Sequence, residues 1–225
     1  MKIILLGLLL LTNATLAFTN TLHFNNVWMI QTAFGHFPHQ KDWFYQLDIH
    51  VRLNTFDPIF RQNLNTLRIG RHLSDTIDYS AAFAYAPTQL QARFINEQRL
   101  WEQIDYRYQL SETLSAQFYN RLEIRWVHEA PGISMRDRFK IVVRACSPQA
   151  IVCPYLASET FINMNRTAWD LGKTLAQQRS GIGLENKLSK AVTLRFGYLN
   201  QTLWFRVNNN LSYDIIDLQA TFNFD

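Results

Sequence analysis

Ten charged side chains share one parity within each of three consecutive stretches of this sequence. In an extended chain, successive side chains point to opposite faces, so residues of the same parity share a face. Opposite charges on neighbouring strands pair favourably, and an arginine can hold a carboxylate with two hydrogen bonds. The pattern therefore predicts one ion-paired surface, made by Glu97, Arg99, Asp105, Arg107, Arg121, Glu123, Arg125, Arg136, Arg138 and Lys140.

Such a surface has two interpretations. If it fills an enclosed space, its ion pairs hold the surrounding strands together and bind nothing, which is the interpretation we favour. If open space remains, its basic bias selects small anions or grips the charged headgroup of a ligand.

Catalysis by histidine and serine is the alternative from a different class of function. A lipid-modifying hydrolase or acyltransferase needs a nucleophile within hydrogen-bond reach of a base, and a third group that orients the base. The chain has six histidines but no Gly-x-Ser-x-Gly turn, and no spacing puts a serine beside a histidine. His50 shares the polar face of its stretch, where we expect it to be a hydrogen-bonded filler. We assign no catalytic residue.

Metal and cofactor sites are also not assigned. His36 and His39 flank a turn at Pro38, and a structural zinc site needs four ligands. No glycine-rich loop for phosphate occurs. The two cysteines stand in Cys146-Ser-Pro-Gln-Ala-Ile-Val-Cys153. An exported chain meets an oxidising compartment, so we predict a disulfide between them, with metal ligation as the alternative.

The elements that carry these residues are β-strands, because apolar and polar residues alternate through most of the chain. In the clearest stretch, 43–54, only Phe44 breaks the alternation. The pattern predicts strands over 27–35, 43–55, 62–72, 77–86, 97–109, 114–127, 135–144, 158–165, 177–188, 192–204 and 211–224. These are eleven, whereas bacterial single-chain barrels have an even number. We therefore predict twelve strands, with ten as the fallback, and expect the error within 18–26, 87–96 or 166–176.

The first seventeen residues have the pattern of a secretory signal peptide. Lys2 precedes an apolar run over 3–11, and small polar residues lead to Ala17. The run is well short of the roughly 20 residues that a spanning helix needs. We predict cleavage after Ala17 and a single domain over residues 18–225.

Several features favour a membrane barrel over a soluble one. Several predicted strands have 11–14 residues, and aromatic residues such as Trp28, Trp43 and Trp126 stand near strand ends. In hydrocarbon every backbone N–H and C=O must be paired, which strands achieve by closing into a barrel. We predict an all-β fold, a single antiparallel transmembrane barrel in the bacterial outer membrane. A soluble periplasmic barrel like a lipocalin, with an apolar ligand inside, is the alternative.

Two strand motifs resemble a known family. The stretches Asn96-Glu-Gln-Arg-Leu-Trp-Glu-Gln103 and Tyr119-Asn-Arg-Leu-Glu-Ile-Arg125 are similar to those of the family called domain of unknown function 2490 (DUF2490), although Glu102, Asn120 and Leu122 depart from its pattern. The resemblance covers about residues 27–224. It implies an outer-membrane β-barrel of unknown function, and it carries over no catalytic residues.

The sequence thus predicts a structural outer-membrane barrel, or a small-solute pore, with an ion-paired and arginine-rich lumen. The expected partners are outer-membrane lipid, the outer-membrane assembly machinery during biogenesis, and small anionic solutes. Nucleic acid is excluded, because the net charge of +4 is small and basic residues are interleaved with acidic ones.

Overall fold

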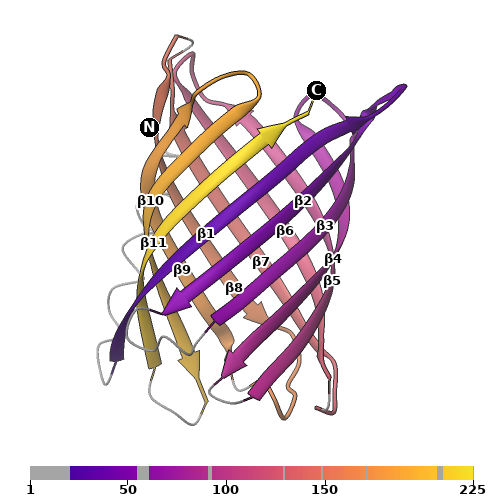
Figure 1. The fold of residues 1–225 in the computed structure, drawn as a ribbon, viewed down its shortest axis with the longest axis vertical. Coiled ribbons are helices and arrows are strands. Elements are labelled where there is room, and N and C mark those ends of the chain that lie inside the picture. The colour runs from indigo at the N-terminus through magenta and orange to yellow at the C-terminus, as the bar shows by residue number, and fades with distance from the viewer. Residues whose placement is uncertain are drawn as a thin grey trace.

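The chain folds into one closed β-barrel (Figure 1). The computed structural model describes residues 21–54, 61–90, 93–128, 130–147, 149–170, 172–206 and 210–224. The described strands are β1 (Thr21–Phe37), β2 (Gln40–Asn54), β3 (Arg61–His72), β4 (Ile77–Leu90), β5 (Arg93–Gln109), β6 (Leu114–Val127), β7 (Ser134–Ala145), β8 (Val152–Asn163), β9 (Gly172–Lys187), β10 (Val192–Phe205) and β11 (Asn210–Asn223).

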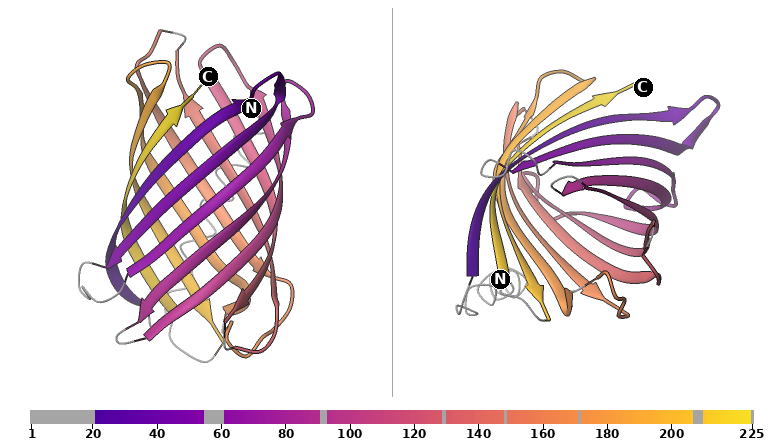
Figure 2. Two further views of the ribbon diagram at one scale, coloured as in Figure 1. Left: turned by 45° about the vertical axis from the view of Figure 1, so that its right-hand side comes forward. Right: turned by 60° about the horizontal axis from the view of Figure 1, so that its bottom comes forward.

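The strands are long and tilted against the barrel axis, as the left view of Figure 2 shows. Their lengths run from 12 to 17 residues, compared with about 5–6 in an ordinary globular sheet. The described residues form no helix that is long and apolar enough to cross a bilayer. The predicted signal peptide, residues 1–17, lies outside the described residues.

The strand count differs from the prediction. The described residues form eleven strands, so both twelve and the fallback of ten are wrong. The described residues of the three stretches in which we expected the error, 18–26, 87–96 and 166–176, do not form a separate strand. Residues 21–26 lengthen β1, residues 87–90 and 93–96 lengthen β4 and β5, and residues 166–170 belong to the connection between β8 and β9.

A parallel seam allows the odd number. Consecutive strands are antiparallel throughout the described chain, so the first and the eleventh strand run in the same direction. They pair in parallel from Thr21↔Asn210 to Phe34↔Asn223, and Figure 1 shows β1 and β11 side by side. The predicted antiparallel barrel is confirmed for every consecutive pair and corrected only at the closing pair, because the even-number rule assumes that the first and last strands are antiparallel.

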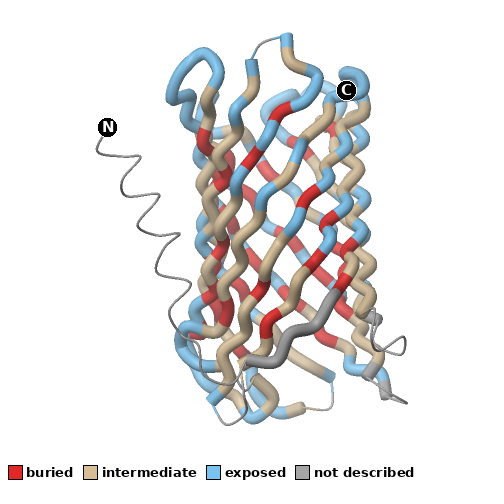
Figure 3. The backbone as a smooth tube through the Cα atoms, turned by 90° about the vertical axis from the view of Figure 1, so that its left-hand side faces the viewer, coloured by how far each residue is buried: buried red, intermediate tan, exposed pale blue. Residues whose placement is uncertain are grey.

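Side chains divide by parity into an apolar exterior and a polar interior. In β5, Glu97, Arg99 and Asp105 are buried inside, whereas Leu100 and Ile104 on the other face are 48% and 54% exposed. Figure 3 shows buried positions alternating with exposed ones along the strands. The barrel is therefore inverted relative to a soluble protein, whose apolar side chains would face inward.

Two features of this division differ from the expected pattern. Trp28 does not belong to an outer aromatic girdle, because it is buried in the lumen.

The outer face also carries two polar rows across β8 to β11. The strand register gives their members: Ser158, Ser180, Asn200 and Asp214 in one row, and Thr160, Gln178, Thr202 and Ser212 in the other. Hydrogen bonds within these rows, such as that from Asn200 Nδ2 to Asp214 Oδ1 at 3.0 Å, pair these outward polar groups with one another.

The parallel seam is testable by crosslinking. Met29 and Leu218 are register partners across β1 and β11 and are both partly exposed on the outer face. Met29→Cys with Leu218→Cys is expected to form a disulfide on mild oxidation, visible as a mobility shift after denaturation. The control pair, Met29→Cys with Phe196→Cys, spans two strand spacings, about 10 Å, which is too far for a disulfide. Crosslinking of the control pair, or of neither pair, would contradict the eleven-stranded register.

Candidate functional site

The ten predicted charged residues lie on the inner faces of three adjacent strands, β5, β6 and β7. Cross-strand register brings Gln103, Arg121 and Arg138 into one row, so the charges face one another within the lumen. They do not form one surface, however. The ion pairs that these ten residues make separate into a central cluster and one cluster toward each mouth of the barrel, and a further group joins Arg144 and Arg195 to Glu185.

The central cluster is built on Glu123, which is fully buried. Arg136 donates to its Oε2 from Nη2 at 2.5 Å and from Nε at 3.1 Å. Arg138 donates from Nη1 to the other oxygen, and Arg121 Nη1 lies 3.6 Å from it. Both carboxylate oxygens are therefore engaged by guanidinium groups, which is what makes a buried charge tolerable.

A second carboxylate, Glu159 on β8, joins the cluster and was not predicted. Arg138 Nη2 donates to Glu159 Oε1 at 2.6 Å, and Arg179 Nη1 to Oε2 at 3.1 Å. The Tyr119 hydroxyl donates to Oε1 as well. Arg138 thus bridges the two carboxylates. Glu159 and Arg179 are register partners, but each is an isolated charge in a stretch of small and amide side chains, so only the pairing of β8 with β9 reveals them.

Aromatic rings fill the space between these charges. The guanidinium carbon of Arg121 lies 3.8 Å from the ring centroid of Trp101. Those of Arg138 and Arg179 each lie 4.6 Å from the ring centroid of the buried Phe161. A cation above a ring face is attracted by the ring quadrupole, most strongly where water is absent. The rings therefore replace part of the hydration that these arginines lose.

One mouth is joined to the connection between β8 and β9. Glu97 accepts from Arg99 at 3.0 Å and from Arg125 Nε at 2.6 Å. Arg125 Nη1 also donates to Asp170 Oδ2 at 2.9 Å, and the Ser134 hydroxyl donates to the same oxygen at 2.9 Å. Partial burial would raise the pKa of the Asp170 carboxyl, but Arg125 and the hydrogen bonds outweigh it and hold that pKa below its ordinary value.

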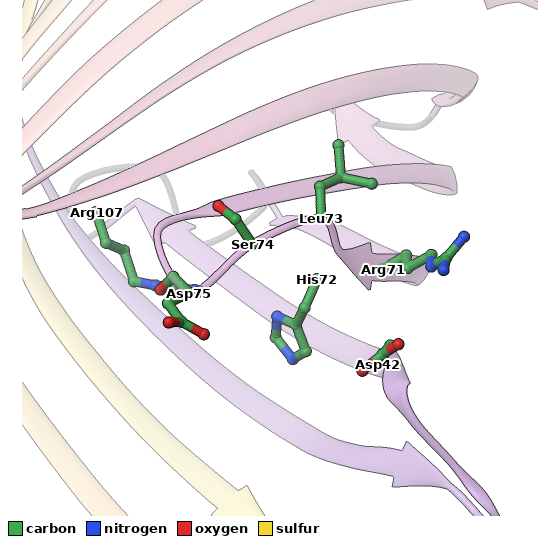
Figure 4. Close-up of a pocket in the computed structure, with 7 residues that line it drawn as sticks. All are labelled: Asp42, Arg71, His72, Leu73, Ser74, Asp75 and Arg107. Carbon is green, nitrogen blue, oxygen red and sulfur yellow. Dashed lines mark hydrogen bonds between the residues drawn. The ribbon is translucent and has the colours of Figure 1, made fainter.

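The opposite mouth carries Asp105 and Arg107. Asp105 pairs with Arg68, and Arg107 pairs with Asp78. Beside them is a surface cavity of about 600 Å³ (Figure 4), in which His72 lies between Arg107 and Asp75 on one side and Arg71 and Asp42 on the other.

The histidines form no metal site within the described residues. His36 and His39 do not come together: His36 Nε2 lies 3.1 Å from His72 Nε2, and His72 Nδ1 lies 2.6 Å from Asp78 Oδ1. No group of three or more potential ligands that could hold a metal ion is found among the described His, Cys, Asp and Glu residues. His50 points into the lumen, where its Nδ1 has no hydrogen-bond partner. The hydrogen bond that we expected for this side chain is therefore not made by Nδ1.

Cys146 and Cys153 are joined by a disulfide. The bond closes the connection between β7 and β8, outside the lumen clusters. Lys140 faces inward from β7 but makes no ion pair with a described residue, and its ammonium nitrogen lies 5.6 Å from the ring centroid of Tyr119.

Comparison with known proteins finds one family and one similar solved structure. The model of the family described as "Protein of unknown function (DUF2490)" matches residues 25–212. A solved structure titled "NanC porin structure in rhombohedral crystal form" is 11% identical, with 83% of this chain and 93% of that chain covered and a TM-score of 0.49. No curated protein matches this chain.

Removing the charge of Glu123 tests the central cluster. Glu123→Gln leaves Arg136 and Arg138 buried with one carboxylate fewer, so we expect the free energy of unfolding to fall by about 3–5 kcal/mol. The measurement is guanidinium unfolding of the purified barrel. Glu112→Gln, in the exposed turn before β6, is the matched control and is expected to stay within about 0.5 kcal/mol of the parent. Equal stability of the two variants would show that the cluster does not depend on this charge.

The ion pair of Asp170 predicts a pH dependence. A carboxyl whose pKa is lower in the folded state stabilises that state above its unfolded pKa, about 3.9, and this contribution is lost as the pH falls through the folded pKa. Asp170→Asn is therefore expected to be less stable than the parent at pH 7, and the gap is expected to close in acid. Unfolding midpoints from pH 7 to pH 2 measure it. A gap of constant size would rule out the ionic contribution of Asp170.

Proposed function

The chain belongs to the DUF2490 family, and on that premise we propose that it is an integral β-barrel of the bacterial outer membrane with a structural role and a lumen closed by its own ion pairs. In this proposal, outer-membrane lipid surrounds the barrel, and the outer-membrane assembly machinery inserts it. The role needs no catalytic residue and no cofactor.

The observation that carries the proposal is the apolar exterior. Strand register aligns Leu47, Leu67, Phe83, Leu100 and Ile124 in one row across β2 to β6, and all five are exposed. Soluble monomers rarely expose continuous apolar patches beyond a few hundred Å². Acyl chains would cover this row, and a closed barrel leaves no strand edge unpaired in hydrocarbon.

The interior argues against a soluble ligand-binding barrel. A lipocalin-like protein encloses an apolar cavity, whereas this lumen contains the buried Glu123, Arg136 and Glu159. The buried apolar cluster of the described residues is limited to Leu64, Ala84 and Ala86. An apolar ligand would have to displace ion pairs that would then lack partners, which is costly.

The packing of the lumen favours a closed barrel over an open pore. Glu123, Phe161 and Ile215 are almost completely inaccessible to water, although they point toward the barrel axis. The rings of Trp28 and Trp101 are buried among them. A lumen filled in this way supports a structural role more than continuous passage of solutes.

The lipid-modifying enzyme has less support. The ring nitrogens of His72 contact His36 and Asp78, and His50 Nδ1 has no hydrogen-bond partner. No serine among the described residues is bonded to either ring, so the nucleophile and base of such an enzyme are not brought together there.

Arginine substitution on the outer face tests the membrane proposal. Leu67, in the middle of β3, is 53% exposed, and Leu73, in the turn after it, is 59% exposed. In lipid vesicles, Leu67→Arg is expected to lower the free energy of unfolding by about 2–4 kcal/mol and Leu73→Arg by about 0–1 kcal/mol, because the cost of an arginine depends on its depth. A barrel in water would tolerate both equally.

Fractionation of the cell envelope completes this test. We expect the parent protein in the outer-membrane fraction, with a mobility on detergent gels that shifts on heating. Recovery in the soluble periplasmic fraction, together with equal tolerance of the two arginine variants, would overturn the proposal.

A further inference from the structure

The central lumen holds more cations than its carboxylates neutralise. Within the described chain, the ion pairs of this region all lead to Glu123 and Glu159. Four arginines share these two carboxylates: Arg121, Arg136, Arg138 and Arg179. Lys140 and Arg52 also face inward and make no ion pair with a described residue. Asp217 lies in the same region, but its Oδ2 accepts from the amide of Gln219 at 2.7 Å, and its Oδ1 has no hydrogen-bond partner. Six cations therefore face three carboxylates.

Among these arginines, Arg52 is the one that makes no ion pair with a described carboxylate. Its Nη1 donates to Gln62 Oε1 at 2.8 Å, and its buried Nε has no hydrogen-bond partner. Its Nη2 donates no hydrogen bond to a described residue. A guanidinium group in a dry environment needs a counter-charge or a full set of acceptors, and Arg52 has one neutral acceptor in the described chain.

A second arginine lies beside Arg52, and the opposite charge that acts on Arg52, Glu159, is already paired with this second arginine, Arg179. The guanidinium carbon of Arg52 is 4.2 Å from the ring centroid of Trp28, and that of Arg179 is 4.8 Å from the same centroid. The two like charges are thus held around one ring. His50 lies two residues before Arg52 on the same face of β2. The charges that act on its ring are those of four arginines: Arg52, Arg121, Arg138 and Arg179.

We propose that Arg52 and Arg179, beside Trp28, form a binding site for a small oxyanion, with phosphate as the ligand chemistry. The planar donor fork of arginine fits phosphate oxygens with two parallel hydrogen bonds, and Arg52 has unused N–H groups for them. An anion there offsets the surplus positive charge of the central lumen. The inference rests on the enclosed lumen of the proposed function, but it does not need the bilayer.

The position of the site inside the lumen favours free phosphate over the phosphate of a lipid headgroup. A free phosphate or a small phosphomonoester is not tethered outside the barrel, whereas the headgroup of a lipid remains attached to acyl chains outside the barrel wall and cannot reach Arg52 and Arg179 in the lumen. Inorganic phosphate and glycerol 3-phosphate are therefore expected to bind, and phospholipid added in micelles is expected not to.

The test compares heat-unfolding midpoints of the full chain, purified in detergent, in chloride and in phosphate at matched ionic strength. The parent midpoint is expected to rise with phosphate concentration and saturate, because a ligand that binds the folded state stabilises it by mass action. Arg52→Gln is expected to lose this rise. In chloride it is expected to unfold at or above the parent midpoint, because one of two neighbouring like charges has been removed.

Two further variants keep the test decisive. Arg68→Gln removes an inward arginine that is paired with Asp105, and it is expected to unfold earlier in both buffers while keeping the phosphate response. Arg52→Lys keeps the charge without the planar fork, and it is expected to respond more weakly than the parent, even if Arg52→Gln does not fold.

Three outcomes would overturn the site. They are a parent midpoint that phosphate does not move, a phosphate response that survives in Arg52→Gln, and a phospholipid response in place of the phosphate response. None of them would change the envelope fraction or the heat-shifted mobility of the parent, so failure of this site is distinguishable from failure of the membrane proposal.

Discussion

The pairing of the Glu123 carboxylate with guanidinium groups from β6 and β7 is the interaction on which the rest of this barrel depends. A charge that is fully buried is tolerable only when both of its oxygens are satisfied. Because Arg138 also reaches Glu159, the pairing extends across the lumen to β8 and β9. Strands that are distant along the chain are thereby tied through the interior as well as through the wall.

An ionic interior has a consequence for the exterior. Because successive side chains of a strand point to opposite faces, a polar face that is turned inward places the apolar face on the outside. Leu67 and Ile104 on this outer face are more than half exposed. This division makes the fold poorly suited to water and well suited to hydrocarbon. The outer polar rows across β8 to β11 are the exception, and their members bond to one another.

The central lumen also shows that filling a space and neutralising it are different conditions. Trp28 and Phe161 occupy volume and lie against arginines, but a ring quadrupole does not cancel a full charge. Arg138 is compensated by two carboxylates, whereas Arg52 has a glutamine and a ring. The same cluster can therefore stabilise the barrel at one position and retain capacity for an anion at another.

The sequence by itself determined the strands and their faces. Alternation is a local property, so the stretches 43–54 and 97–109 could be located, and the inward residues named, without any knowledge of neighbours. Family membership was likewise readable from the motifs of β5 and β6. Phe44, which interrupts the alternation of its stretch, is nevertheless inward and buried, because parity decides the face even where hydropathy disagrees.

Only the tertiary structure decided how many strands close the barrel and which charges meet. The eleven segments of the pattern were sufficient, but whether β1 can pair in parallel with β11 depends on closure, which no local pattern contains. The same holds for Glu159 with Arg179, for Asp170 with Arg125, and for the isolation of Arg52. Each depends on register between strands, and register is set by hydrogen bonding between segments that are far apart in the chain.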